Sequence, residues 1–240
     1  MIDMYFWPTP NGWKVSIMLE ECGLPYKVIK TDIGRGDQFK PEFIKISPNN
    51  RIPAIVDHDG PNGLLAVFES GAILLYLADK TGQFISSDPN ERYDAIQWLF
   101  WQMGNLGPMA GQFGYFRNYA PEKIEPAIER YGNEYDRLLG VMNRRLNDRD
   151  YLAGDYSIAD IASLPWVRAH DRMGVVLDEF PNLQRWLDAI VERPAITKAY
   201  ETGLDWFRKG GKPDKESRKH LFNQSSDSVG DAIDKAADNG

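Results

Sequence analysis

The first residues whose types and spacing suggest chemistry form the turn Thr9-Pro10-Asn11-Gly12, between an expected apolar strand and an amphipathic helix. The backbone N–H groups of this turn, with the Thr9 and Asn11 side chains, lie at a helix start, where unpaired donors and the helix dipole favour an anion. Many redox proteins carry a reactive cysteine here, but this turn has none. The turn predicts an anion-binding helix start, with a purely structural helix cap as the alternative.

A second candidate is Ile52-Pro53, at the head of an expected strand that follows a polar turn. A cis bond before Pro53 would expose the N–H and C=O groups of Ile52 as an unpaired strand end, onto which an extended peptide can add. A trans proline at the start of an edge strand is the commoner alternative.

Two further signals lie near the same sheet edge. Glu69 and Ser70 open the next helix, and the Ser70 N–H and hydroxyl beside a carboxylate can hold the two charged groups of an α-amino acid. A simple N-cap at Ser70 is the alternative. Gln38 and Arg51 flank this edge and can reach a terminal carboxylate.

The elements that must position these residues alternate between strand and helix over residues 1–81. Strands are expected at 2–6, 26–31, 52–56 and 64–68, and helices at 12–22, near 41–46 and from 69 onward. The order βαβαββα predicts an α/β domain in which helices pack on a four-stranded mixed sheet.

The remainder of the chain is predicted to be helical. Residues 82–89 are expected to link the first domain to an all-helical bundle over 90–207, with helices at 90–105, 121–147, 157–173 and 181–193. Polar residues 208–240 predict a disordered or loosely docked tail. A further hypothesis is that Trp206, Phe207 and this tail form a lid over the substrate pocket.

Composition narrows the function classes. With 28 Lys and Arg against 35 Asp and Glu, the net charge is -7, which argues against a nucleic-acid surface. Cys22 is the single cysteine and the three histidines are scattered, so no metal site is expected. No apolar run approaches the ~20 residues that span a bilayer. A cytoplasmic protein without a membrane partner is expected.

The order and spacing of these pieces resemble the glutathione transferase superfamily over nearly the whole chain. The resemblance is carried by "PTPNG", "SPNNRIPAIVD", "FESGAILLYLADKTG", "AIERY" and the "YSIADI" of the helical part, and is greatest to the bacterial Nu-class and Ure2p-like branch. It implies a thioredoxin-like first domain, an all-helical second domain, glutathione as co-substrate and a homodimer. The tail lies outside the resemblance.

The same resemblance implies that the reactive sulfur belongs to a bound glutathione. Thr9 and Asn11 would face the thiolate, and the Ile52 backbone would pair with the cysteinyl unit across a cis bond to Pro53. The protein would then bind and ionise the thiol of glutathione, which takes the place of the cysteine that the turn lacks.

The ends of glutathione are assigned by the same resemblance. Glu69 and Ser70 would hold the γ-glutamyl end, and Gln38 and Arg51 would meet the glycyl end. Arg130, in "AIERY", matches a family arginine that reaches the site, in some cases from a partner subunit.

The second substrate is expected over the thiolate, between the domains. Residues 98–121 are rich in aromatic residues and methionine but are interrupted by glycines, which favours an irregular apolar pocket. Its predicted lining comes from Met109, Phe113, Tyr115, Phe116 and Tyr119, while Trp98 and Trp101 are expected in the helix core. Such a pocket would suit a hydrophobic or aromatic electrophile.

The resemblance leaves two reactions open, since both have a glutathione thiolate attack a sulfur bonded to another group. One is glutathione-dependent disulfide reduction, and the other removes glutathione from an aromatic thioether; both form glutathione disulfide. A non-catalytic glutathione-binding regulatory protein that acts through protein contacts is the alternative.

Overall fold

A computed structural model describes residues 1–206 and 213–238 of the chain. Its sheet contains β1 (Ile2–Phe6), β2 (Tyr26–Lys30), β3 (Ala54–Gly60) and β4 (Gly63–Phe68), in the spatial order β2-β1-β3-β4. Strand β1 is parallel to β2 and antiparallel to β3, and β3 is antiparallel to β4. The predicted four-stranded mixed sheet is confirmed.

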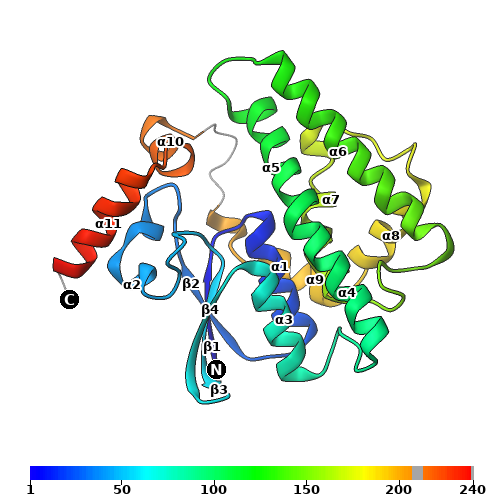
Figure 1. The fold of residues 1–240 in the computed structure, drawn as a ribbon, viewed down its shortest axis with the longest axis horizontal. Helices are drawn as coiled ribbons and strands as arrows, with labels where there is room; N and C mark the ends of the chain where they lie inside the picture. The colour runs from blue at the N-terminus through cyan, green and yellow to red at the C-terminus, as the bar shows by residue number, and fades with distance from the viewer. Residues whose placement is uncertain (207–212, 239–240) are drawn as a thin grey trace.

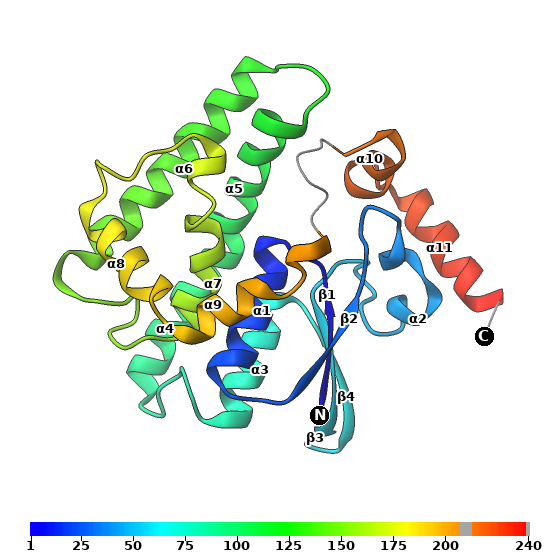
Figure 2. The ribbon, with the colours of Figure 1, turned by 180° about the vertical axis from the view of Figure 1, so that it is seen from behind.

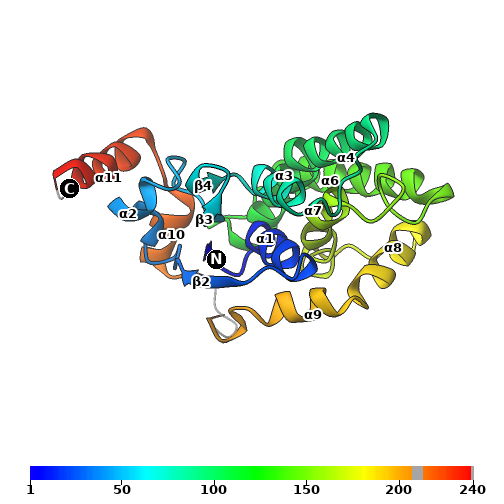
Figure 3. The same ribbon diagram turned by 90° about the horizontal axis from the view of Figure 1, so that it is seen from below.

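The helices of this sheet domain are α1 (Pro10–Glu21), a 3₁₀ turn (Asp37–Phe39), α2 (Pro41–Ile44) and α3 (Ser70–Thr81). Helices α1 and α3 lie between the sheet and the helical domain, as Figures 1 and 3 show. Helix α1 is therefore buried from Gly12 to Leu19, including positions that a surface helix would expose.

The helical domain follows from α4 onward (Figure 2). Its α-helices are α4 (Pro89–Trp101), α5 (Gly107–Gly114), α6 (Glu125–Arg145), α7 (Ile158–Val167), α8 (Pro181–Val191) and α9 (Pro194–Glu201). Gln102–Leu106 and Tyr115–Tyr119 are π-helical, and 3₁₀ turns occupy Leu146–Asp148, Asp171–Met173 and Leu204–Trp206. The sequence pattern did not predict α5 or α9, because glycines interrupt the first and the second is short.

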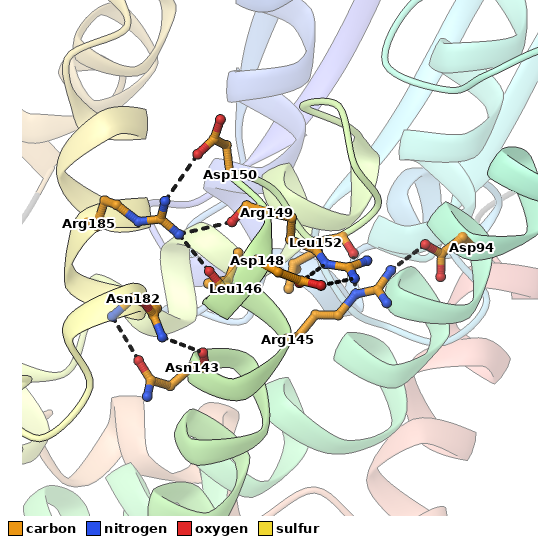
Figure 4. Close-up of polar contacts among 10 residues, drawn as sticks. All are labelled: Asp94, Asn143, Arg145, Leu146, Asp148, Arg149, Asp150, Leu152, Asn182 and Arg185. Atoms are coloured by element: carbon orange, nitrogen blue, oxygen red, sulfur yellow. Dashed lines mark hydrogen bonds and ion pairs between the residues drawn. The ribbon is translucent and has the colours of Figure 1, made fainter.

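Polar contacts fix the end of α6 against its neighbours (Figure 4). Arg185 donates to the carbonyl of Leu146 at 2.6 Å, and Arg145 donates to the carbonyl of Leu152 at 2.7 Å. The Asn143 side chain accepts the backbone N–H of Asn182 at 2.9 Å, at the start of α8. The bonds at Leu146 and Asn182 satisfy backbone groups that the ends of α6 and α8 leave unpaired, and so they fix these two helices against each other.

The C-terminal region is helical, which corrects the first of the two alternatives predicted for it, a disordered tail. Within it, α10 (Lys215–Phe222) and α11 (Ser226–Asp238) form helices, and α11 lies beside α2, far from α8 (Figure 3). Trp206 stacks on Trp7 at 5.9 Å, so it packs against the sheet domain and not over the interdomain cleft. Phe207 and residues 208–212 and 239–240 lie outside the described residues. Within the described ranges, no helix has the length and apolar character needed to span a membrane.

Candidate active site

A cleft of about 530 Å³ lies between the two domains. From the sheet domain it is lined by Asn11, Lys14, Asn49, Arg51, Ile52, Pro53, Glu69 and Ser70. From the helical domain it is lined by Gln102, Met103, Gly107, Pro108, Gly111, Gln112 and Trp166. The structure thus brings together Asn11, the Arg51-Ile52-Pro53 stretch and the Glu69-Ser70 pair, which were predicted from separate motifs.

Asn11 is held by a residue from the other domain. Its Oδ1 accepts the indole N–H of Trp166 at 3.1 Å. Because an indole nitrogen can only donate, this bond fixes Oδ1 as the acceptor and leaves the Nδ2 donors of Asn11 for another partner. No sequence pattern pointed to Trp166, which lies 155 positions further along the chain.

Thr9 serves as the helix cap that was the structural alternative. It is the N-cap of α1, and its Oγ1 accepts the backbone N–H of Gly12 at 3.2 Å. This bond leaves the hydroxyl hydrogen available, but Thr9 does not line the cleft in the part of the chain that the structure describes.

The bond between Ile52 and Pro53 is cis, as the peptide-binding interpretation required. The pairing of β3 with β1 and with β4 begins at Ala54, so Ile52 lies just beyond both ladders. Its backbone therefore sits at the end of the strand, on the wall of the cleft.

Glu69 and Ser70 lie at the start of α3. Glu69 adopts a φ of 70°, which residues other than glycine rarely adopt, and its Oε1 accepts the side-chain N–H of Asn49 at 3.1 Å. Ser70 is buried and its hydroxyl donates to Met103 Sδ at 3.6 Å. The strained backbone and the paired carboxylate orient both residues at the helix start.

Lys14 is a cleft residue that sequence reasoning missed. It is 1% exposed, and its Nζ donates to Gln102 Oε1 at 2.7 Å, Met103 Sδ at 3.3 Å and Ser70 Oγ at 3.4 Å. Burial lowers the pKa of Lys14 to about 7, against the opposing effect of the Glu69 charge. Its spacing of three from Asn11, on one face of α1, was the available signal.

Gln38 and Arg130 are not brought to this cleft. Gln38 is 2% exposed and its Nε2 donates to the carbonyls of Ile33 at 3.2 Å and His220 at 3.3 Å, so it faces α10. Arg130 is exposed on α6 and does not line the cleft of its own chain in the described residues. Its contribution from a partner subunit stays a prediction.

The predicted aromatic lining is also absent from this cleft. Met109 packs against the core, Phe113 lies 6.0 Å from Tyr135, and Phe116 stacks on Tyr131 at 5.5 Å. These side chains recur every three to four residues and so share the face turned to α6.

Tyr115 and Tyr119 meet a ring from the tail instead. The Phe222 ring of α10 lies 4.9 Å from the Tyr115 ring and 5.7 Å from the Tyr119 ring. The opposite face of α5 presents Gly107, Pro108, Gly111 and Gln112 to the cleft, so that wall is small and partly polar, not aromatic.

Comparisons with known proteins identify the family. Models of the glutathione S-transferase N-terminal and C-terminal domains match residues 9–80 and 104–194. The chain is also 54% identical over 202 residues to the disulfide-bond oxidoreductase YfcG of Escherichia coli (strain K12), covering 83% of this chain and 94% of YfcG. The chain belongs to the glutathione S-transferase family.

Solved structures of family members agree with this assignment. A glutathione transferase from Pseudomonas putida, with one glutathione disulfide bound per subunit, is 49% identical and has a TM-score of 0.79, over 84% of this chain and 91% of that one. Ure2p in complex with glutathione is 35% identical, with a TM-score of 0.77, over 82% and 97%. The resemblance to the Ure2p-like branch of the glutathione S-transferases is confirmed.

Within the described residues, no group of three or more His, Cys, Asp or Glu side chains could hold a metal ion. The charged side chains that line the cleft are Lys14, Arg51 and Glu69. The cleft therefore offers both signs of charge and several amide groups, which suits a zwitterionic peptide ligand.

Proposed function

We propose that this glutathione S-transferase is a glutathione-dependent disulfide reductase, in which the thiolate of a bound glutathione attacks a disulfide. The observation that carries the proposal is the composition of the cleft, in which Asn11, held by Trp166, lies with glycine, proline, glutamine and methionine residues of the helical domain. The disulfide oxidoreductase name of YfcG and the glutathione disulfide bound by the Pseudomonas putida relative support it.

In this proposal glutathione lies along the sheet-domain side of the cleft. The backbone of Ile52 pairs with the cysteinyl unit, and Glu69 and Ser70 hold the γ-glutamyl ammonium and carboxylate. Arg51 is exposed at the rim, where it can meet the glycyl carboxylate. Gln38 has no part in this arrangement while its amide is bonded to His220.

The free energy needed to ionise the glutathione thiol can be compared with what the site supplies, without a cysteine of the protein. Lowering a thiol pKa from about 8.5 by ~2 units takes roughly 2.7 kcal/mol of preferential thiolate stabilisation. The start of a helix contributes ~0.3–1 kcal/mol, and a hydrogen bond to a charged sulfur about 1.5–3 kcal/mol. The Asn11 Nδ2 donors, together with the helix start on which Asn11 lies, are sufficient.

The reaction consists of two sulfur exchanges. The bound thiolate attacks one sulfur of the substrate disulfide, the S–S bond breaks, and the other sulfur leaves as a thiolate that takes up a proton. The mixed disulfide is then attacked by a second glutathione thiolate, which releases the remaining substrate thiol and forms glutathione disulfide. Two glutathione molecules are oxidised for each disulfide reduced.

The shape of the second wall favours a disulfide over an aromatic thioether. The aromatic side chains of α5 and the following π-turn contact α6 and α10, while Gly107 and Gly111 let Gln102 and Trp166 approach closely and Gln112 offers an amide. Trp166 is thus the one aromatic residue that lines the cleft in the described part of the chain. A flexible, polar disulfide fits such a wall better than a planar apolar ring, which gains most from aromatic contacts.

The test measures glutathione disulfide formation by the purified chain with a small dialkyl disulfide and, separately, with an aromatic ketone carrying a glutathione thioether. Faster turnover of the disulfide is expected. Faster turnover of the thioether would show that the lyase activity is the main one. Glutathione binding with no turnover of either substrate would favour the non-catalytic regulatory protein.

A further inference from the structure

Lys14 is unusual because its amine is buried among neutral partners. Ser70 Oγ, Gln102 Oε1 and Met103 Sδ surround its Nζ, and in the described parts of the chain the nearby Glu69 carboxylate is bonded to Asn49 and forms no ion pair with Lys14. An ammonium group is costly to bury without a counter-ion. The fold nevertheless retains a lysine on the cleft wall.

A second observation at the same place points to a ligand. Gln102 is 0% exposed and lines the cleft, and its Nε2 has no hydrogen-bond acceptor among the residues that the structure describes. Its Oε1 is bonded to Lys14, so the amide orientation that leaves Nε2 free is fixed. The π-turn that begins at Gln102 is a geometry often found at functional sites.

Lys14 and Asn11 are three positions apart on α1, and both line the cleft. Helical side chains lean toward the N-terminus of their helix, so the Lys14 amine is directed toward the turn that carries Asn11. A negative charge held at Asn11 is therefore close to a buried amine that has no ionic partner.

We propose that Lys14 is the counter-ion of the glutathione thiolate, and that its amine gains a proton as the bound thiol loses one. This inference rests on the proposed function. The S–H bond of glutathione breaks and an N–H bond forms on Lys14, directly or through water, so the site acquires an ion pair while its net charge stays the same. Lys14 thus acts on the sulfur through its charge.

The other charged groups that face this region cannot play the same part. Arg51 is exposed at the rim and stays protonated, so it cannot take up a proton. Glu69, at the start of α3, carries the opposite charge and is bonded to Asn49. The groups contributed by the π-turn and α7, which are Gln102, Met103 and Trp166, do not titrate.

The test compares thiolate formation with proton release. Thiolate is measured by its ultraviolet absorbance when glutathione binds at about pH 8, and protons are counted by calorimetry in two buffers of different ionisation enthalpy. The variants are Lys14→Met, which fits the buried space without a charge, and Lys14→Arg, which keeps a permanent charge. Lys27→Met, at an exposed position of β2, is the matched control.

In the native protein and in Lys27→Met, thiolate is expected with much less than one proton released per glutathione. In Lys14→Arg, thiolate is expected with roughly one proton released, because arginine has no proton to take up. In Lys14→Met, the pKa of the bound thiol is expected to rise by about one unit or more.

Two results would overturn the inference: one proton released per thiolate in the native protein, or thiolate that titrates identically in the native protein and in Lys14→Met. If Lys14→Met does not fold, the number of protons released by the native protein and by Lys14→Arg still decides the question. Glutathione that binds and ionises without any disulfide turnover would instead contradict the proposed function alone.

Discussion

Two of the links between the sheet domain and the helical side of the molecule differ in kind. The inner link lies in the cleft, where Trp166 bonds Asn11 at 3.1 Å and Gln102 bonds Lys14 at 2.7 Å. The outer link is α10, which accepts a bond from Gln38 and donates one to the carbonyl of Tyr119 at 2.6 Å. The inner link orients reactive groups, while the outer link only braces the two domains.

The two links also differ in their relation to the family. Asn11, Lys14 and Trp166 fall within the residues matched by the glutathione S-transferase domain models, 9–80 and 104–194, and Gln102 lies two residues before the second range. Helix α10 lies beyond both ranges. We therefore expect changes in the inner link to affect the chemistry, and changes in the outer link to affect only how substrates enter.

The largest expected effect comes from removing the donor at the centre of the inner link. Asn11→Ala is expected to lower kcat/KM for a small disulfide about 10²–10³-fold, the usual loss when one preorganised donor to a developing anion is removed. Glutathione affinity should change only a few-fold, because Ile52, Glu69 and Ser70 remain. Steady-state kinetics and a glutathione titration measure both, with Asn90→Ala, at an exposed position, as control. Unchanged kcat/KM would remove Asn11 from the mechanism.

The second prediction concerns the stability cost of Lys14. Its pKa is about 7 in the folded protein against 10.5 as the ordinary value, so between these pH values the unfolded chain binds more protons. The free energy of unfolding should therefore rise with pH across this window, by an amount on the order of a few kcal/mol.

Denaturant titrations from neutral pH to about pH 10 measure this slope. Lys14→Met should abolish most of the rise and be more stable than the native chain at neutral pH, since no ammonium is buried. Lys27→Met should keep the slope. A slope that survives in Lys14→Met would assign it to other groups.

Trp166→Phe sharpens the comparison, because it removes only the bond that orients Asn11. A neutral hydrogen bond is worth about 0.5–1.5 kcal/mol, so kcat/KM for the disulfide is expected to fall by up to ~10-fold. The pKa of the bound glutathione thiol should rise in parallel. Asn11→Ala combined with Trp166→Phe should be no worse than Asn11→Ala alone, and additive losses would show that Trp166 acts independently.

The sequence predicted the parts of the site that depend on local signals. Asn11, Pro53 and Ser70 each lie at the start of a strand or helix, where turn residues and caps have recognisable patterns. The sheet topology followed from the alternation of strands and helices. Lys14 and Gln102 gave no such signal, because a lysine in a helix ordinarily faces solvent and its partners are brought by folding alone.

Two other errors have physical causes. The aromatic and methionine content of residues 98–121 predicted that Met109, Phe113 and Phe116 line the pocket, but composition does not say which side chains of α5 and the π-turn face α6 and which face the cleft. The polar composition of residues 208–240 predicted a disordered or loosely docked tail, yet α10 forms a helix whose Phe222 ring meets Tyr115 and Tyr119. A helix with so small an apolar face is not distinguishable from a disordered segment by composition.

The smallest expected effect comes from the outer link. Phe222→Ala removes the ring that meets Tyr115 and Tyr119, and aromatic pairs of this kind are worth about 0.5–1.5 kcal/mol each beyond the area that they bury. Since α10 does not line the cleft in the described residues, the thiolate pKa and the kcat for a small disulfide should stay within about twofold.

A bulky disulfide, such as a glutathionylated protein, tests the access role of the outer link. Its KM should change about two- to fivefold in Phe222→Ala, because a loosened α10 lets the two domains separate further at the rim. Leu221→Ala, on the same helix but outside these ring contacts, is the matched control. A change in the pKa of the bound thiol in Phe222→Ala as large as that in Trp166→Phe would contradict this comparison. The outer link would then affect the reaction itself and not only the access of the substrate.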